Sequence, residues 1–137
     1  MSNYEFEISS FLEKKGAVAI LVRLDSADGI LFSDLINVVH VSSTTLSNRL
    51  KEGRRIDLFR LRRKAEDHGN SQRNQLTDRG ERLRKEMVSV GLDEAYEQYF
   101  QAMQQIDSER KEVREWLQES GITDPQWVPK SDRGRFI

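Results

Sequence analysis

Three segments between Phe32 and Leu83, in this order, constrain the fold more than any other feature of the sequence. Phe32-Ser-Asp-Leu35 and residues 41–50 (Val-Ser-Ser-Thr-Thr-Leu-Ser-Asn-Arg-Leu) have the apolar spacing of two short helices, the second with a polar face. Residues 58–76 then alternate like two strands that project arginines, and Leu76-Thr-Asp-Arg-Gly-Glu-Arg-Leu83 begins a further helix. The order predicts a pair of packed helices beside a hairpin that carries positive charge.

Positive charge is concentrated in one part of the 137-residue chain, although the net charge is only −1. Residues 49–85 contain 13 Lys and Arg against 6 Asp and Glu, a balance of +7. A concentrated positive segment in a near-neutral chain is expected of a protein that binds a polyanion. A solvated, salt-bridged helix face explains the charge equally well, so the charge alone does not choose between the two.

Composition excludes several classes of protein. The sequence has no cysteine, which removes disulfides and thiolate metal ligands. Its longest apolar run, Ala17–Val22, has six residues, whereas a membrane-spanning helix needs about 20. The acidic start Met-Ser-Asn-Tyr-Glu-Phe-Glu lacks the features of a secretory signal. We therefore expect a cytoplasmic protein without a membrane partner.

The N-terminal helices are predicted from their capping residues. Ser10-Phe-Leu-Glu13 has the Ser-x-x-Glu form of a capping box, so the first helix is predicted to begin there, with Gly16 as a kink or a second start. Ile30–Phe32 can form a very short strand. Ser33 is predicted to cap the helix that follows, and Thr77 to cap the helix after the hairpin.

The helix predicted over residues 43–52 has an unusual polar face. If Leu46 and Leu50 face the core, the opposite side carries short hydrogen-bonding side chains and one cation: Ser43, Thr44, Ser47, Asn48 and Lys51. Such side chains can approach base edges closely, and an asparagine can pair with adenine through two hydrogen bonds. Capping of the helix start explains Ser42 and Ser43 but neither Ser47 nor Asn48. This face favours contact with bases.

The hairpin is predicted to present cations to the DNA backbone or the minor groove. Phe59 and Leu61 are predicted to point one way, and Arg60, Arg62 and Lys64 the other. A turn-rich segment, including Asp67-His-Gly-Asn70, leads to a return strand over residues 72–76. The predicted backbone contacts are Arg54, Arg55, Arg60, Arg62, Lys64 and Arg73. This interpretation requires that internal ion pairs, the tail or a twin subunit do not occupy this surface. Arg49, between the two faces, could instead pair within the domain.

A heptad pattern begins at Leu92 and continues for more than three heptads, interrupted by Arg110. Its apolar members, predicted to form a dimer interface, are Leu92, Tyr96, Tyr99, Met103, Ile106, Val113 and Leu117. A helix packed back on its own domain is the alternative, but so long a seam exceeds what a small core can cover. Gly121 is predicted to end the helix, and Trp127 to be an anchor in the tail.

The sequence offers little for catalysis. His40 and His68 have no neighbouring cluster of His or Cys, so neither a metal site nor a catalytic site is predicted. There is no phosphate-binding glycine loop and no nucleophile elbow. We therefore expect that the protein is not an enzyme and that it binds no cofactor. A gap for a small-molecule effector near Tyr96, Tyr99 and Phe100 is an alternative to plain packing, and we favour packing.

The chain resembles the winged helix-turn-helix transcriptional regulators of bacteria and archaea, of the MarR, PadR and HxlR types. HxlR-type proteins look closest, and the resemblance covers residues 11–88. The matching motifs are Lys15-Gly-Ala-Val-Ala-Ile-Leu21, Phe32-Ser-Asp-Leu35, Thr45-Leu-Ser-Asn-Arg-Leu50 and Leu76-Thr-Asp-Arg-Gly80. The sequence departs from the pattern at Lys51–Asp57, in place of a helix end followed by Gly-Leu-Val or Gly-Leu-Ile. It departs again at Asn74, where an aliphatic or aromatic residue commonly precedes the Leu-Thr pair.

The resemblance implies an α+β, mostly helical fold with three parts. These are a winged helix-turn-helix DNA-binding domain over residues 9–90, a long amphipathic dimerisation helix over 91–121 and a C-terminal tail over 122–137. It implies a homodimeric transcriptional regulator of double-stranded DNA, with the recognition helix 43–52 in the major groove and residues 58–76 as the wing. The alternative is a winged-helix module for protein–protein contact, because a fold does not fix a function.

Overall fold

The computed structural model describes residues 4–67, 69, 71–121 and 126. The predicted turn residues His68 and Asn70 lie outside these ranges, as do Trp127 and most of the tail. The chain divides into two compact units, Met1–Phe100 and Gln101–Ile137.

The first unit begins with helix α1 (Tyr4–Glu13) and helix α2 (Ala17–Arg23). The prediction that a helix starts at Ser10 was wrong, because the four residues of the proposed capping box form the last turn of α1. Contacts distant in sequence fix the earlier start: the Tyr4 hydroxyl donates to the Ile56 carbonyl at 2.5 Å, and Arg79 stacks on the Tyr4 ring. Gly16 separates the two helices with a left-handed φ of 86°, which confirms the second start.

A two-residue strand, β1 (Ile30–Leu31), leads directly into helix α3 (Phe32–Leu35). Ser33 does not cap this helix as predicted, because the extended residue Leu31 takes the N-cap position, without a side-chain hydrogen bond. Backbone hydrogen bonds of the turn type continue through Val38, and Leu35 and Val39 are buried.

Helix α4 (Ser43–Arg55) is the predicted recognition helix, extended by one turn at its C-terminal end. The Ser42 hydroxyl accepts from the Thr45 backbone N–H at 3.1 Å, which satisfies a donor at the helix start. Leu46 and Leu50 are buried, so the polar face of α4 points away from the core. Gly53 allows close packing on the next strand, since a methyl group there would overlap the Phe59 ring.

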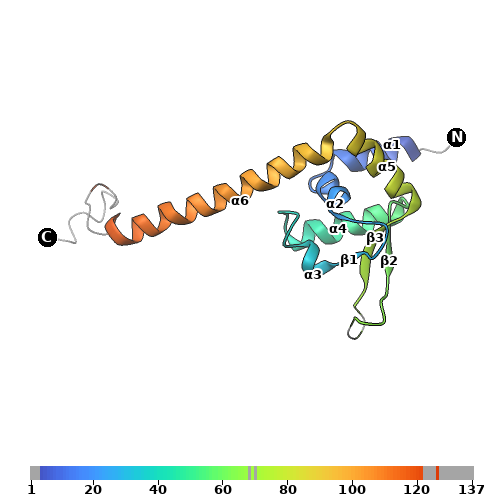
Figure 1. Cartoon of the computed structure of the whole chain (residues 1–137), viewed down its shortest axis with the longest axis horizontal. Coiled ribbons are helices and arrows are strands. Elements are labelled where there is room, and N and C mark those ends of the chain that lie inside the picture. Colours follow the sequence, from blue (N-terminus) through green and yellow to red (C-terminus); the bar gives the residue numbers. More distant parts are fainter. Residues whose placement is uncertain (1–3, 68, 70, 122–125, 127–137) are drawn as a thin grey trace. The chain divides into compact units, whose positions relative to one another are not determined.

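The wing is the antiparallel pair β2 (Phe59–Arg62) and β3 (Arg73–Leu76), and β1 pairs with the other edge of β3 (Figure 1). In the β2–β3 register, Phe59 is opposite Leu76 and Arg62 is opposite Arg73. Phe59 is buried against α4. Leu61 lies on the same sheet face but is 43% exposed, because the core ends before it.

The Leu-Thr-x-x-Gly motif joins the wing to helix α5 (Asp78–Ser89). Leu76 is buried, and the Thr77 hydroxyl accepts from the Gly80 N–H at 3.1 Å, which confirms the predicted cap. The same hydroxyl donates to the Asp57 carbonyl at 2.6 Å. Gly80 packs on the Leu58 carbonyl so closely that a side chain would overlap it. The motif therefore fixes the base of the wing.

Helix α6 (Leu92–Trp116) begins in the first unit, where Phe100 is buried and Leu92 and Tyr96 pack against the core. From Gln101 it belongs to the second unit, and a single π-helical turn, Leu117–Gly121, follows it. Ile106, Val113 and Leu117 are exposed. Among the described residues, no helix is long and apolar enough to cross a membrane.

Candidate nucleic-acid interface

The outer face of α4 carries the five side chains predicted to contact bases. Ser43, Thr44, Asn48 and Lys51 are exposed, and Ser47 is half-buried. Within the part of the chain that the structure describes, none of the five side chains forms a hydrogen bond or an ion pair. A ligand could therefore bind them without first displacing an internal partner.

A charged network fastens α4 to the α1–α2 connection. Arg49 pairs with Glu52 at 2.8 Å and donates to the Lys15 carbonyl at 3.0 Å, and Lys14 pairs with Glu52 at 3.1 Å. Burial alone would raise the pKa of Glu52, but hydrogen bonds from Lys14 and Arg49 outweigh it and lower the pKa. Arg49 thus has the internal role that the sequence left open, and it holds α4 against the α1–α2 connection.

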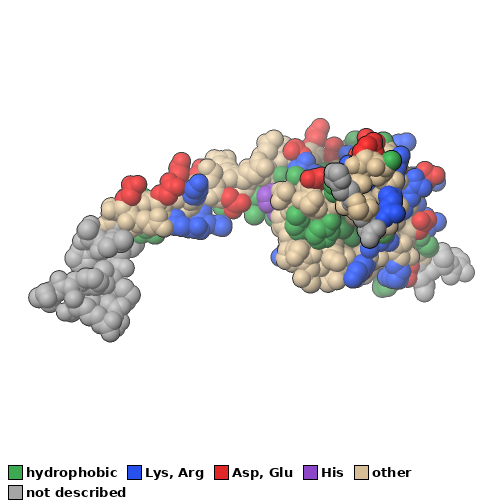
Figure 2. Space-filling view, turned by 90° about the horizontal axis from the view of Figure 1, so that it is seen from below, with side chains coloured by type: hydrophobic (Ala, Val, Ile, Leu, Met, Phe, Trp, Pro, Cys, Tyr) green, Lys and Arg blue, Asp and Glu red, His purple; other side chains and the backbone are tan. Residues whose placement is uncertain are grey.

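The wing places cations on the sheet face that does not pack on α4. Arg60 lies opposite Gln75 and Arg62 opposite Arg73, so the three arginines project from one face. Figure 2 shows Lys and Arg side chains gathered toward one side of the first unit, with hydrophobic side chains toward the other.

Two of these wing cations are held in internal ion pairs. Lys64 pairs with Asp28 at 2.9 Å and is only 21% exposed, while Arg73 pairs with Asp67 at 2.9 Å and donates to the Gly29 carbonyl at 3.2 Å. The hydrogen bond and charge of Lys64 lower the pKa of Asp28, and a hydrogen bond from Arg73 lowers the pKa of Asp67. The condition that the cations be unpaired therefore fails for Lys64 and Arg73.

The other predicted backbone contacts differ in exposure. Arg60 donates to the Gln75 side chain at 2.8 Å and Arg62 to the Ala27 carbonyl, and both remain exposed without an ion pair among the described residues. Arg55 is exposed but forms an ion pair with Glu7 at 3.6 Å, so the condition that the cations be unpaired fails for Arg55 as well. Arg54 is half-buried and donates to the Asn74 side chain at 2.9 Å, and its burial lowers the pKa of its guanidinium.

A polar network that the sequence patterns did not predict lies inside the base of the wing. Asn74 is 4% exposed and Gln75 is 1% exposed. Asn74 accepts from Arg54, and Gln75 donates to the carbonyls of Ser26 and Ala27 at 3.1 and 3.2 Å. The available signal was Asn74 itself, a polar residue where the family pattern commonly has an apolar one.

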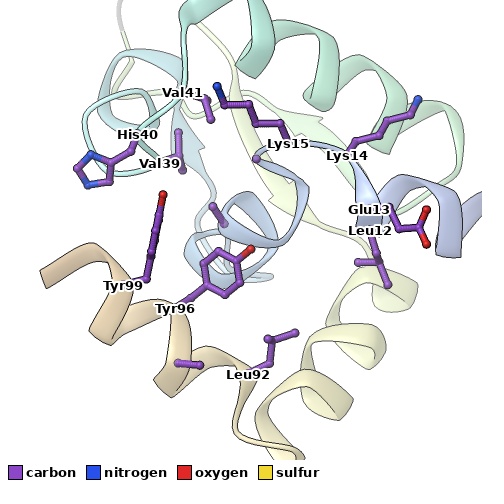
Figure 3. Close-up of a pocket in the computed structure, with 13 residues that line it drawn as sticks. Leu12, Glu13, Lys14, Lys15, Val39, His40, Val41, Leu92, Tyr96 and Tyr99 are labelled. Atoms are coloured by element: carbon purple, nitrogen blue, oxygen red, sulfur yellow. The ribbon is translucent and has the colours of Figure 1, made fainter. Parts of the chain in front are cut away.

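A groove of about 530 Å³ lies on another side of the first unit (Figure 3). Leu92, Tyr96 and Tyr99 of α6 form one wall, and residues 39–41 with the α1–α2 connection form the other. The sequence favoured plain packing for Tyr96, Tyr99 and Phe100. Phe100 is buried and Tyr96 packs against the core, whereas Tyr99 is about half exposed. Among the described residues, no group of three or more His, Cys, Asp or Glu side chains is placed to hold a metal ion.

No protein-family model matches the chain, and no curated protein matches it in sequence. Its fold is similar to that of AbsC, a MarR family transcriptional regulator from Streptomyces coelicolor, at 18% identity and a TM-score of 0.53, over 86% of this chain and 84% of that one. The transcriptional regulator SlyA has 20% identity and a TM-score of 0.53, with coverage of 86% and 84%.

A possible HxlR family transcriptional factor from Thermoplasma volcanium has 23% identity and a TM-score of 0.50, over 72% of this chain and 82% of that one. These structures are of transcriptional regulators, not of enzymes. The chain therefore has the winged-helix fold of MarR-type and HxlR-type regulators, which confirms the predicted resemblance and fold class.

Proposed function

We propose that this chain is a homodimeric transcriptional regulator that binds double-stranded DNA sequence-specifically. In this proposal residues 43–52 of α4 enter the major groove, and the wing, residues 58–76, contacts the backbone or the minor groove. Regulators of the same fold, described as MarR family and HxlR family proteins, support this class of function.

The observation that carries the proposal is the unoccupied polar face of α4. Asn48 and Lys51 are exposed on the side opposite the buried Leu46 and Leu50. Short polar side chains beside one cation suit base edges flanked by phosphates, whereas a helix that only covers a domain commonly carries Glu and Lys.

The cations of the wing do not all have the same role in the proposed DNA contact. Arg60 and Arg62 are exposed, and their partners are uncharged groups, so we assign them phosphate contacts. Arg55 is assigned with them because its side chain stays 65% exposed although it pairs with Glu7. Lys64 and Arg73 are assigned to holding the wing in place, through Asp28 and Asp67.

The second candidate is a winged-helix module that binds protein instead of DNA. The observation in its favour is the same pairing of Lys64 and Arg73, which reduces the positive charge available to a polyanion. Arg60, Arg62 and Lys51 have no such acidic partner among the residues described, and this favours DNA.

Selection of bound sequences from random duplex DNA tests the proposal. We expect an enriched motif of inverted half-sites about 10 base pairs apart, one helical turn. Asn48→Ala should relax the preference at particular bases by about 1–3 kcal/mol, and Gln104→Ala in α6 is the matched control. Equal losses on selected and random DNA would contradict the role of Asn48. Absence of any DNA binding would favour the protein-binding module.

The dimer is proposed to form through the heptad seam of α6. Tyr99 and Ile106, about half exposed, lie on this seam. Tyr99→Glu combined with Ile106→Glu should therefore yield a monomer in sedimentation experiments, because the substitutions place negative charge on the apolar seam. A dimer mass that stays unchanged would place the interface elsewhere.

A further inference from the structure

The second unit presents an apolar stripe that nothing else in its described part covers. Ile106 is 46% exposed, Val113 56% and Leu117 37%, although all three occupy seam positions of the heptad pattern. In the second unit, the described residues form only the end of α6, one π-helical turn and the exposed residue Gln126. A helix with one apolar face is normally paired with another helix.

The N-terminal end of the seam is not available in the same way. Leu92 and Tyr96 pack against the core of the first unit, and Phe100 is buried there. The stretch that can accept a helix is therefore centred in Gln101–Gly121, near residue 111.

We propose that this stretch binds the same stretch of a second copy in antiparallel orientation, with Ile106 of each helix opposite the partner's Leu117. The proposal deepens the proposed dimer and rests on it. In this register the numbers of two facing residues add to 223, as for Ile106 and Leu117. Residues 102–121 of one helix therefore lie along residues 121–102 of the other.

Arg110 decides the orientation. It occupies a position equivalent to Met103 and Leu117 in the heptad, so a parallel pair would place it directly against the partner's Arg110. Two guanidinium groups in contact within an apolar seam repel each other. In the antiparallel register, Arg110 instead faces the partner's Val113, and its own Asp107 lies 3.7 Å away.

The charged residues that flank the seam favour this register over registers shifted by one heptad. It places Asp107 beside the partner's Arg114 on both sides of the two-fold axis, which gives two attractive pairs. A shift by one heptad in one direction brings Asp107 against the partner's Asp107. A shift in the other direction brings Arg114 against the partner's Arg114. Both shifts also shorten the overlap.

Cysteine cross-linking of the full chain tests the orientation, since the sequence has no native cysteine. In the antiparallel pair, Ile106 and the partner's Ile106 are 11 residues apart along the axis, about 16 Å at 1.5 Å per residue. A disulfide needs Cα atoms within about 7 Å. Ile106→Cys alone should therefore not cross-link, whereas an equimolar mixture of Ile106→Cys and Leu117→Cys should do so readily.

Ser108→Cys, on the outer face of the helix, gives the rate of random collision. The mixture should exceed that rate by at least about tenfold. Rapid self-cross-linking of Ile106→Cys would show a parallel pair and overturn the orientation, but it would leave the proposed dimer intact. A monomeric mass of the unaltered protein in sedimentation would overturn the dimer itself.

Charge exchange gives a second test that requires no disulfide. Arg114→Asp should weaken the dimer by roughly three- to tenfold, because it creates a repulsive pair. Adding Asp107→Arg should restore dimer affinity in the antiparallel arrangement. Adding Glu109→Arg is the matched control, and stronger restoration by Glu109→Arg would instead support the parallel arrangement, in which Glu109 lies beside the partner's Arg114.

Discussion

Helix α4 and the wing lie side by side in the first unit (Figure 1), yet their polar side chains have opposite surroundings. Asn48 on α4 has no internal partner among the described residues, whereas Lys64 and Arg73 of the wing are paired with carboxylates. A side chain without a partner gives up only water when it binds DNA. A paired cation must also exchange a carboxylate for a phosphate. Charge in the sequence therefore indicates attraction to DNA but not availability.

The largest expected effect is a loss of stability when the contact between α4 and the wing is disturbed. Gly53→Ala should destabilise the protein by about 1–3 kcal/mol, because the added methyl group overlaps the Phe59 ring at the contact between α4 and β2. Urea unfolding measures the loss. Ser47→Ala, on the outer side of the same helix, is the control and should leave stability nearly unchanged. Equal stability of both variants would show that this contact does not couple the two regions.

Removing single wing cations should show which of them contact DNA and which are held by an internal carboxylate. Arg62→Ala should reduce the slope of log affinity against log salt by about one unit for all duplexes, because one phosphate contact is lost. Lys64→Ala should reduce it by clearly less, since Asp28 already holds Lys64. Binding titrations at several salt concentrations give both slopes. Equal reductions would mean that Lys64 leaves Asp28 when DNA binds.

Removing the Asp28 carboxylate, which competes with DNA for Lys64, should strengthen DNA binding instead of weakening it. Asp28→Asn takes away the charge that holds Lys64, so we expect tighter binding to every duplex and a steeper salt dependence. The same titrations measure the change. Asp34→Asn removes an acidic group of α3 that is not in contact with the wing cations, and it serves as the control. A salt slope that does not steepen would place Lys64 away from the DNA.

The smallest expected effect is a pH dependence of wing stability. A hydrogen bond from Arg73 lowers the pKa of Asp67, so the stabilisation is present above the ordinary carboxylate pKa and disappears as the pH falls through the lowered value. The difference in unfolding free energy between the unaltered protein and Asp67→Asn should therefore narrow between about pH 5 and about pH 2. A constant difference over this interval would contradict the pairing.

Local patterns predicted most of the fold. Ser42 and Thr77 cap helices because a hydroxyl satisfies an orphan N–H wherever the chain enters a helix, and Leu46 and Leu50 mark a buried face by spacing alone. The same reasoning failed at Ser10, because the start of α1 depends on contacts of Tyr4 with residues far along the chain.

The state of the wing cations could not be predicted from local sequence. Asp28 is 36 positions from Lys64, and the β1–β3 pairing helps to bring the loop that precedes β1 beside the wing. The burial of Gln75 likewise depends on two carbonyls of that loop. Residue type therefore predicted which side chains could contact DNA, whereas tertiary structure determined which of them are already engaged.

The hydrogen bonds of Asn74 and Gln75 fix the pairing register of β3 at the base of the wing, whatever the length of the hairpin beyond it. A slip of β3 by one residue would exchange the two sheet faces and leave both amides without partners, so the alignment is fixed where the hairpin leaves the body. Insertions or deletions of two residues beyond Arg62 and before Arg73 preserve the facing of every side chain below them. The length of this hairpin can therefore change while the position of α4 on the core stays the same.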